Sequence, residues 1–222
     1  MIWLGILLIT TLLYYIISDR LFMKQDLSKI SKVKLYKDTI ARQWLIVLML
    51  GIIWGWQGFE WKDWVTSAQS WNSSIVNGLL IGIIAGICFS LIMPFFLQKK
   101  GKAPVTVGNI DFFMPQTRYE RIWFVFVAIT AGICEELIFR GAMTYFLFEL
   151  PVELPLWTIG LLVSILFSMA HLYQGISGIV ATSFLGVIFF VLFIGTGSLL
   201  LPIILHFMMD VRFALMPRTK TV

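Results

Sequence analysis

The sequence is poor in charged residues, in histidine and in cysteine. Only 13% of its 222 residues are Asp, Glu, Lys or Arg, and 59% are hydrophobic, whereas charged residues make up roughly a quarter of soluble domains. This balance excludes a soluble globular protein and predicts an integral membrane protein. Two cysteines, Cys88 and Cys134, both lie within apolar runs, and they exclude a disulfide framework.

Seven apolar runs are each close to the ~20 residues that cross the hydrocarbon core of a bilayer. They cover residues 2–17, 44–59, 75–97, 122–148, 156–171, 176–194 and 199–215. We therefore predict an all-α fold, a polytopic transmembrane helix bundle of about seven spans. The first run has no basic segment before it and no small-residue cleavage pattern after it, so we expect a retained helix.

Basic residues set the expected orientation of the bundle. The formal net charge is +5, and the positive residues are concentrated in segments 20–42 and 99–121 and after residue 211. Cytoplasmic loops of membrane proteins carry an excess of Lys and Arg and face anionic lipid. We therefore expect membrane lipid, and no nucleic acid, as the partner of these charges, with the N-terminus outside and the C-terminus in the cytoplasm.

A glycine stripe marks the third run. Gly78, Gly82 and Gly86 recur at every fourth residue, and small residues at this spacing allow another helix to approach closely. We expect this stripe to pack against a neighbouring helix.

Five ionisable side chains lie inside the later apolar runs: Glu135, Glu136, His171, His206 and Asp210. The two histidines are the only ones in the chain. A charged group at the centre of a membrane helix costs at least ~2.5–3.5 kcal/mol, so such residues indicate a functional site by default.

The two adjacent carboxylates are expected to have different roles. Glu136 and Arg140 are four residues apart and share a helix face, so they can form an ion pair. Glu135 is rotated by about 100° from Glu136 and is free to face another helix. The structural alternative is that all three side chains only hold the bundle together.

The histidine runs suggest how the imidazoles are held. Phe167 lies one turn before His171 and could hold its ring in place. His206 and Asp210 are four residues apart, so they converge on one point, either as metal ligands or as a carboxylate that orients an imidazole.

The charges of these residues do not balance. With Glu135, Glu136 and Asp210 ionised against Arg140, two negative charges are left uncompensated. Either protons occupy these groups or a divalent cation lies among them. In the second case, the O and N ligands that zinc accepts would be supplied by Glu135, His171, His206 and Asp210.

Three motifs in order resemble the CPBP family of intramembrane proteases, the CAAX-protease and bacteriocin-processing group also called Abi proteins. They are the E-E-x-x-x-R of Glu135–Arg140, the F-x-x-x-H of Phe167–His171 and the H-x-x-x-D of His206–Asp210. Phe184–Gly186 and Thr196–Ile204 also look like the last two helices of that family. The resemblance covers roughly residues 120–215.

The resemblance implies an endopeptidase that acts on membrane-associated proteins or peptides. Glu135 and His171 would activate water, Glu136 and Arg140 would support the site, and His206 with Asp210 would stabilise the oxyanion. One position departs from the CAAX-cleaving members, in which Asn is common at the place of Asp210. Because an ionised Asp cannot donate a hydrogen bond to an oxyanion, Asp210 could be protonated, could orient His206 or could bind a metal, and zinc remains a possible cofactor.

On this basis the chain divides into three parts. Residues 1–120 form an N-terminal three-span region with basic cytoplasmic loops, residues 121–216 form the CPBP-like catalytic core, and residues 217–222 form a cytoplasmic tail. We expect a multi-pass protein of a cell membrane, of bacterial type, whose oligomeric state the sequence does not indicate.

Three other functions fit part of the pattern. Gly175–Gly178 matches the G-x-S-G of rhomboid-type serine proteases, although that reading leaves Glu135 and His171 without a role. The buried charges also suit a small proton- or cation-coupled transporter. A catalytically idle bacteriocin-immunity or regulatory scaffold would retain the same motifs.

Overall fold

The computed structural model describes residues 1–25, 30–66, 73–100 and 107–216, and in these residues every extended regular element is a helix. This confirms the all-α expectation. The helices are α1 (Ile2–Phe22), α2 (Lys32–Trp56), α3 (Trp61–Val65), α4 (Ser73–Lys99), α5 (Arg118–Glu135), the π-helix η2 (Glu136–Met143), α6 (Thr144–Phe148), α7 (Leu156–Met169), the 3₁₀ turn η3 (Leu172–Gln174), α8 (Gly175–Thr196) and α9 (Leu200–Leu215).

A helix is present at each of the seven predicted positions, but the helices differ in length. Five segments of the described chain are long and apolar enough to cross a membrane: α1, α2, α4, the continuous stretch α5–η2–α6, and η3–α8. α7 and α9 have 14 and 16 residues, fewer than the ~20 of a complete crossing. The five long helices establish a multi-pass membrane protein, while seven crossings remains a prediction.

Two helices begin earlier than their apolar runs. α2 begins at Lys32, twelve residues before the predicted start, and Ser31 caps it by accepting a hydrogen bond from the backbone N–H of Lys34 at 3.4 Å. α5 begins at Arg118, and Thr117 caps it in a capping box with Glu120. The predicted basic loop at residues 20–42 is therefore mostly helical, because hydropathy marks where a helix enters lipid and not where the helix begins.

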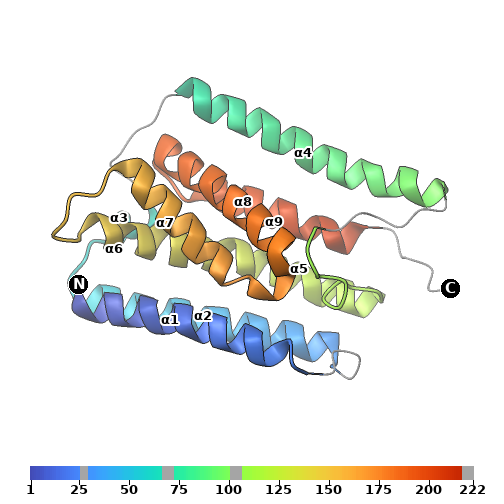
Figure 1. The fold of residues 1–222 in the computed structure, drawn as a ribbon, viewed down its shortest axis with the longest axis horizontal. Helices are drawn as coiled ribbons and strands as arrows, with labels where there is room; N and C mark the ends of the chain where they lie inside the picture. The colour runs from blue at the N-terminus through green and yellow to red at the C-terminus, as the bar shows by residue number, and fades with distance from the viewer. Residues whose placement is uncertain (26–29, 67–72, 101–106, 217–222) are drawn as a thin grey trace.

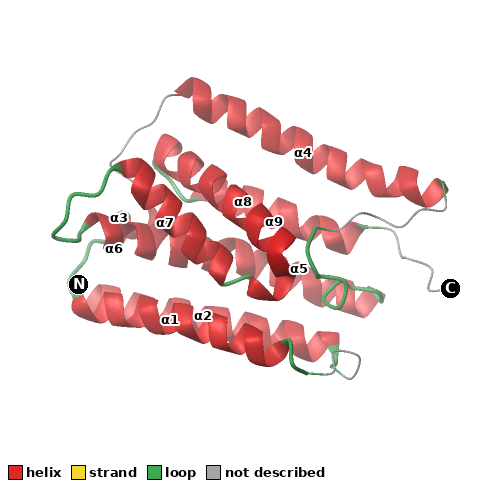
Figure 2. Ribbon diagram, viewed as in Figure 1, coloured by secondary structure: helices red, strands yellow, loops and turns green. Residues whose placement is uncertain are grey.

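Figures 1 and 2 show how the helices are arranged. α1 and α2 lie side by side along one edge, α4 lies along the opposite edge, and α5, α7, α8 and α9 fill the space between them. The main apolar core lies among α1, α2, the π-helix, α7 and α8. A smaller apolar cluster brings together residues of α2, α5 and α9 that lie far apart in the sequence.

Basic residues are concentrated at one end of the bundle. The end of the bundle where α1, α4 and α9 end and where α2 and α5 begin (Figure 1) carries Arg20, Lys32, Lys99, Arg118 and Arg212. The opposite connections carry Glu60, Lys62, Asp63, Glu149 and Glu153. The predicted orientation, with the basic end in the cytoplasm, stays a prediction. The predicted tail at residues 217–222 lies outside the described residues.

The glycine stripe of α4 does not pack as expected. A Cβ added at Gly78, Gly82 or Gly86 would meet no atom of the described residues within 4 Å. α4 instead contacts α8 and α9 through larger side chains, among them Val76, Ile83 and Ile87. The prediction of close packing at the stripe was wrong within this chain, because α4 turns its bulkier face toward the bundle.

Candidate active site

The two adjacent glutamates lie at a change of helix type. Glu135 is the last residue of α5, and Glu136 is the first residue of the π-helix. The apolar run predicted one continuous α-helix, so the π-helical part was missed. Single π-helical turns inside α-helices are rare and frequently occur at functional sites.

The π-helix is enclosed on every side. It contacts α1, α2, α3, α7 and α8, and seven of its eight residues are buried. Trp64 of α3 donates its Nε1–H to the Leu137 carbonyl oxygen at 2.8 Å. A Cβ at Gly141 would lie 2.6 Å from atoms of Trp64, so this close contact requires glycine.

Glu136, Arg140 and His206 form a buried network. Nη1 of Arg140 donates to Oε1 of Glu136 at 2.9 Å, and both side chains are fully buried. The same oxygen lies 2.7 Å from Nδ1 of His206. The predicted ion pair is present, but Glu136 also holds the imidazole of α9, which the sequence did not indicate. The Arg140 guanidinium lies over the Phe167 ring at 4.2 Å, where a cation is attracted by the aromatic face.

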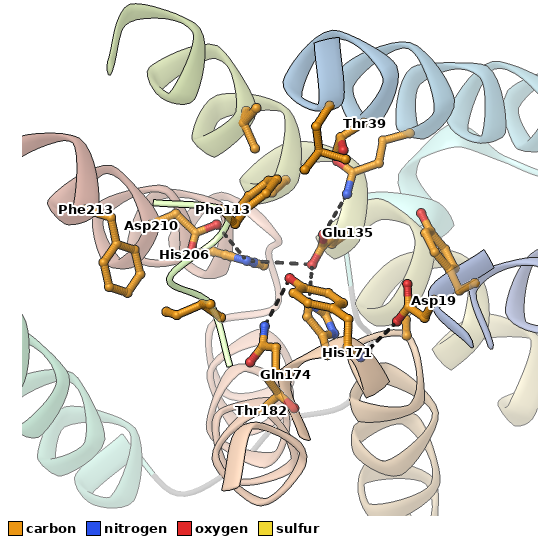
Figure 3. A pocket seen from close by; sticks show the side chains of 18 of the residues that line it. Asp19, Thr39, Phe113, Glu135, His171, Gln174, Thr182, His206, Asp210 and Phe213 are labelled. Atoms are coloured by element: carbon orange, nitrogen blue, oxygen red, sulfur yellow. Dashed lines mark hydrogen bonds and ion pairs between the residues drawn. The ribbon is translucent and has the colours of Figure 1, made fainter. Parts of the chain in front are cut away.

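Glu135 points toward both histidines (Figure 3). Its Oε2 lies 3.6 Å from Nε2 of His171 and 3.8 Å from Nε2 of His206. This oxygen is buried and has no hydrogen-bond partner among the described residues. The expected divergence of Glu135 and Glu136 is therefore present, and it leaves one carboxylate oxygen of Glu135 facing two imidazoles.

His171 lies just beyond the end of α7. Its Nδ1 lies 2.9 Å from the Phe167 carbonyl oxygen, which only accepts hydrogen bonds, so Nδ1 carries the proton and Nε2 faces Glu135. The Phe167 ring contacts the imidazole with a centroid distance of 4.7 Å. The ring and the backbone of Phe167 thus both position His171.

Asp210 lies near His206 without a hydrogen bond to it. Oδ2 of Asp210 is 3.7 Å from Nε2 of His206, a distance too long for a hydrogen bond. Glu136, and not Asp210, therefore orients the His206 ring. Asp210 lines the cavity beside it and is partly exposed, with 33% of its side-chain surface accessible.

A cavity of about 230 Å³ is lined by Glu135, His171, His206 and Asp210. Figure 3 shows Glu135 between His171 and His206, with Asp19 of α1 and Thr39 of α2 also on the wall. The cavity wall also includes several aromatic side chains: Phe22, Phe112, Phe113, Phe124, Phe189 and Phe213. A cavity with mostly apolar walls and a few converging polar groups is typical of a ligand or active site.

Sequence reasoning missed the residues that the first two helices contribute. Nε2 of Gln43 on α2 donates to Oε1 of Glu135 at 2.7 Å. Oδ2 of Asp19 accepts from the backbone N–H of Tyr173, two residues after His171, at 3.4 Å. Gln43 lies directly before the apolar run at residues 44–59, and this position was the available signal for it.

The possible zinc site is not supported by the geometry. Within the described ranges, no group of three or more His, Cys, Asp or Glu side chains is arranged to hold a metal ion. Nδ1 of His206 is engaged with Glu136 and Nδ1 of His171 with a backbone carbonyl, and Nε2 of each histidine faces Glu135. The position of Ser177 excludes the G-x-S-G serine-protease alternative. Ser177 is exposed at the start of α8 and does not line the cavity.

The fold and the site define a multi-pass helical membrane protein with a buried Glu–His centre. Residues 117–212 match the family described as type II CAAX prenyl endopeptidase Rce1-like. This match confirms the resemblance drawn from the three motifs, because residues 117–212 are similar to that family of CAAX proteases. Comparisons with curated proteins and with solved structures gave no significant match.

Proposed function

We propose that this protein is an intramembrane endopeptidase in which Glu135 and His171 activate water. The observation that supports this most directly is Oε2 of Glu135, which accepts no hydrogen bond from the described residues and lies 3.6 Å from Nε2 of His171. A carboxylate and an imidazole at this separation can both contact one water molecule. The family match adds that the domain is of a CAAX-protease type.

The proposed reaction uses Glu135 as a general base and then as a general acid. Glu135 takes a proton from water while the water oxygen attacks the scissile carbonyl carbon. The C–N bond then breaks as Glu135 passes the same proton to the leaving nitrogen. General acid–base catalysis of this kind contributes about 10²–10⁴-fold. His171 holds the water in line through Nε2.

His206 is the proposed donor to the oxyanion. Its Nδ1–H is held by the Glu136 carboxylate, an arrangement that favours a second proton on Nε2, and Nε2 faces the cavity. A positively charged imidazole also offsets one of the two excess negative charges. A buried donor aimed at a developing oxyanion acts in low dielectric, where it stabilises the transition state most strongly. Glu136, Arg140 and Phe167 support this geometry.

The test is hydrolysis of membrane-associated peptides by the purified protein in lipid nanodiscs. The panel includes matched peptides with and without a prenylated cysteine near the C-terminus. We expect Glu135→Gln and His171→Ala each to lower kcat/KM by about 10²–10⁴-fold. Glu149→Gln, at an exposed carboxylate after α6, is the matched control and should cleave like the wild type.

Cleavage that persists in Glu135→Gln would refute the proposed mechanism. The glutamate mechanism also predicts that a zinc chelator leaves cleavage unchanged, whereas loss on chelation that zinc restores would indicate a metalloenzyme. A transporter would show ion flux that Glu135→Gln abolishes with no cleavage in any protein. An idle scaffold would keep its cellular phenotype in both Glu135→Gln and His171→Ala.

A further inference from the structure

Gln43 brings a polar side chain from outside the family-matched region into the candidate active site. It lies on α2, 92 residues before Glu135 in the sequence, and only 5% of its surface is exposed. Its Nε2 donates to Oε1 of Glu135 at 2.7 Å. Because a carboxylate only accepts hydrogen bonds, the amide nitrogen is the atom that must face it.

This hydrogen bond sets the orientation of the Glu135 carboxylate, so that one oxygen is held and the other faces the histidines. With Oε1 held by Gln43, Oε2 is the oxygen directed at His171 and His206. Without Gln43, rotation of the carboxylate about its terminal bond would be limited only by packing, since terminal bonds of this type have broad preferences. Gln43 therefore gives Glu135 one defined orientation in the cavity.

The chemical nature of the partner also fits a reactive carboxylate. Glu136 is paired with a cation, Arg140, and an adjacent positive charge holds a carboxylate in its ionised form. Glu135 receives a hydrogen bond from a neutral amide, which orients it and adds no charge. A carboxylate that must take up and return a proton is better served by the neutral donor.

Gln43 is a costly residue for stability alone. Its own side-chain oxygen is buried and has no hydrogen-bond partner in the described part of the chain. A buried acceptor left in this state is destabilising. Gln43 is not the sole link between α2 and α5, because the next residue, Trp44, also joins the two helices by donating to Oγ1 of Thr130 at 3.2 Å.

We infer that Gln43 is a positioning residue for the catalytic Glu135, so that α2 completes the active site of the family domain. This inference rests on the proposed function for its effect on catalysis. The other groups around the Glu135 carboxylate are His171, His206, Asp210, Tyr15, Tyr173, Cys134 and Arg140, and none of them bonds to Oε1 of Glu135 in place of Gln43.

The test compares Gln43→Met with Trp44→Phe in the full chain in nanodiscs. Methionine keeps the unbranched shape of glutamine and removes the donor, while Trp44→Phe removes a different hydrogen bond between α2 and α5. We expect Gln43→Met to lower kcat by about 10–100-fold, the equivalent of one hydrogen bond to a charged group, with KM unchanged. Trp44→Phe should keep the wild-type kcat.

A spectroscopic measurement tests the contact without relying on cleavage. The infrared band of the Glu135 carboxylate is identified by its loss in Glu135→Gln, and we expect it to shift in Gln43→Met and to stay in place in Trp44→Phe. If Gln43→Met matches Trp44→Phe in both kcat and band position, the inference is wrong, while loss of cleavage in Glu135→Gln still supports the proposed function. A band shift in a protein that cleaves no peptide supports the positioning contact and refutes the proposed function.

Discussion

Replacing Glu136 by Gln should destabilise the protein strongly, because it leaves a buried cation without its partner. Glu136 and Arg140 are both fully buried, and their charged atoms are 2.9 Å apart. Glutamine keeps the size of the side chain and removes the negative charge. Arg140 would then retain mainly the aromatic rings of Phe167 and Phe189, at 4.2 and 5.4 Å. Removing one partner of a buried ion pair costs about 3–5 kcal/mol.

The double variant Glu136→Gln/Arg140→Met separates stability from activity. With both charges removed, no uncompensated cation remains, and apolar replacements of buried ion pairs are often neutral for stability. We therefore expect the double variant to regain most of the stability lost by Glu136→Gln. Cleavage should stay impaired, because the imidazole of His206 has lost the carboxylate that holds its Nδ1, 2.7 Å away.

The assay is reversible unfolding in mixed micelles, followed by circular dichroism as the denaturing detergent is increased. The exposed pair of Glu60 and Lys62 provides a matched control. Their charged atoms are 2.6 Å apart, but both side chains are more than 60% exposed. Exposed ion pairs contribute little to stability, so Glu60→Gln should unfold like the wild type.

Two outcomes would contradict this reasoning. If Glu136→Gln unfolds like Glu60→Gln, the buried pair does not hold the π-helix in place. If the double variant is less stable than Glu136→Gln alone, Arg140 stabilises the fold through its contacts with Phe167 and not through its charge.

Two further substitutions test the surroundings of the site. Gly141→Ala should lower the free energy of unfolding by about 1–3 kcal/mol, the cost of overpacking, because the added Cβ would meet Trp64 at 2.6 Å. The same unfolding titration measures this change, and a wild-type result would show that Trp64 can move. Asp210→Asn should leave kcat within a few-fold of the wild type, because Asp210 makes no hydrogen bond to His206; a loss as large as that of His206→Ala would place Asp210 in the catalytic step.

Much of the site was predictable because its motifs are local. Residues four apart on a helix are neighbours whatever the rest of the chain does, so the pairing of Glu136 with Arg140 and the placement of Phe167 beside His171 followed from spacing. The divergence of Glu135 from Glu136 followed in the same way. The common site of the two histidines was an expectation from polarity, and the structure brings both within 3.8 Å of Glu135.

The sequence by itself determined the membrane class, the helical fold and the identity of the buried ionisable residues, because hydropathy and short spacings are properties of single segments. Only the tertiary structure decided that Glu136 holds His206, that Gln43 holds Glu135, and that the stripe of α4 is unpacked. The two hydrogen bonds, of Glu136 with His206 and of Gln43 with Glu135, join residues up to 92 positions apart. They depend on how whole helices pack, and no periodicity within one helix specifies its neighbour.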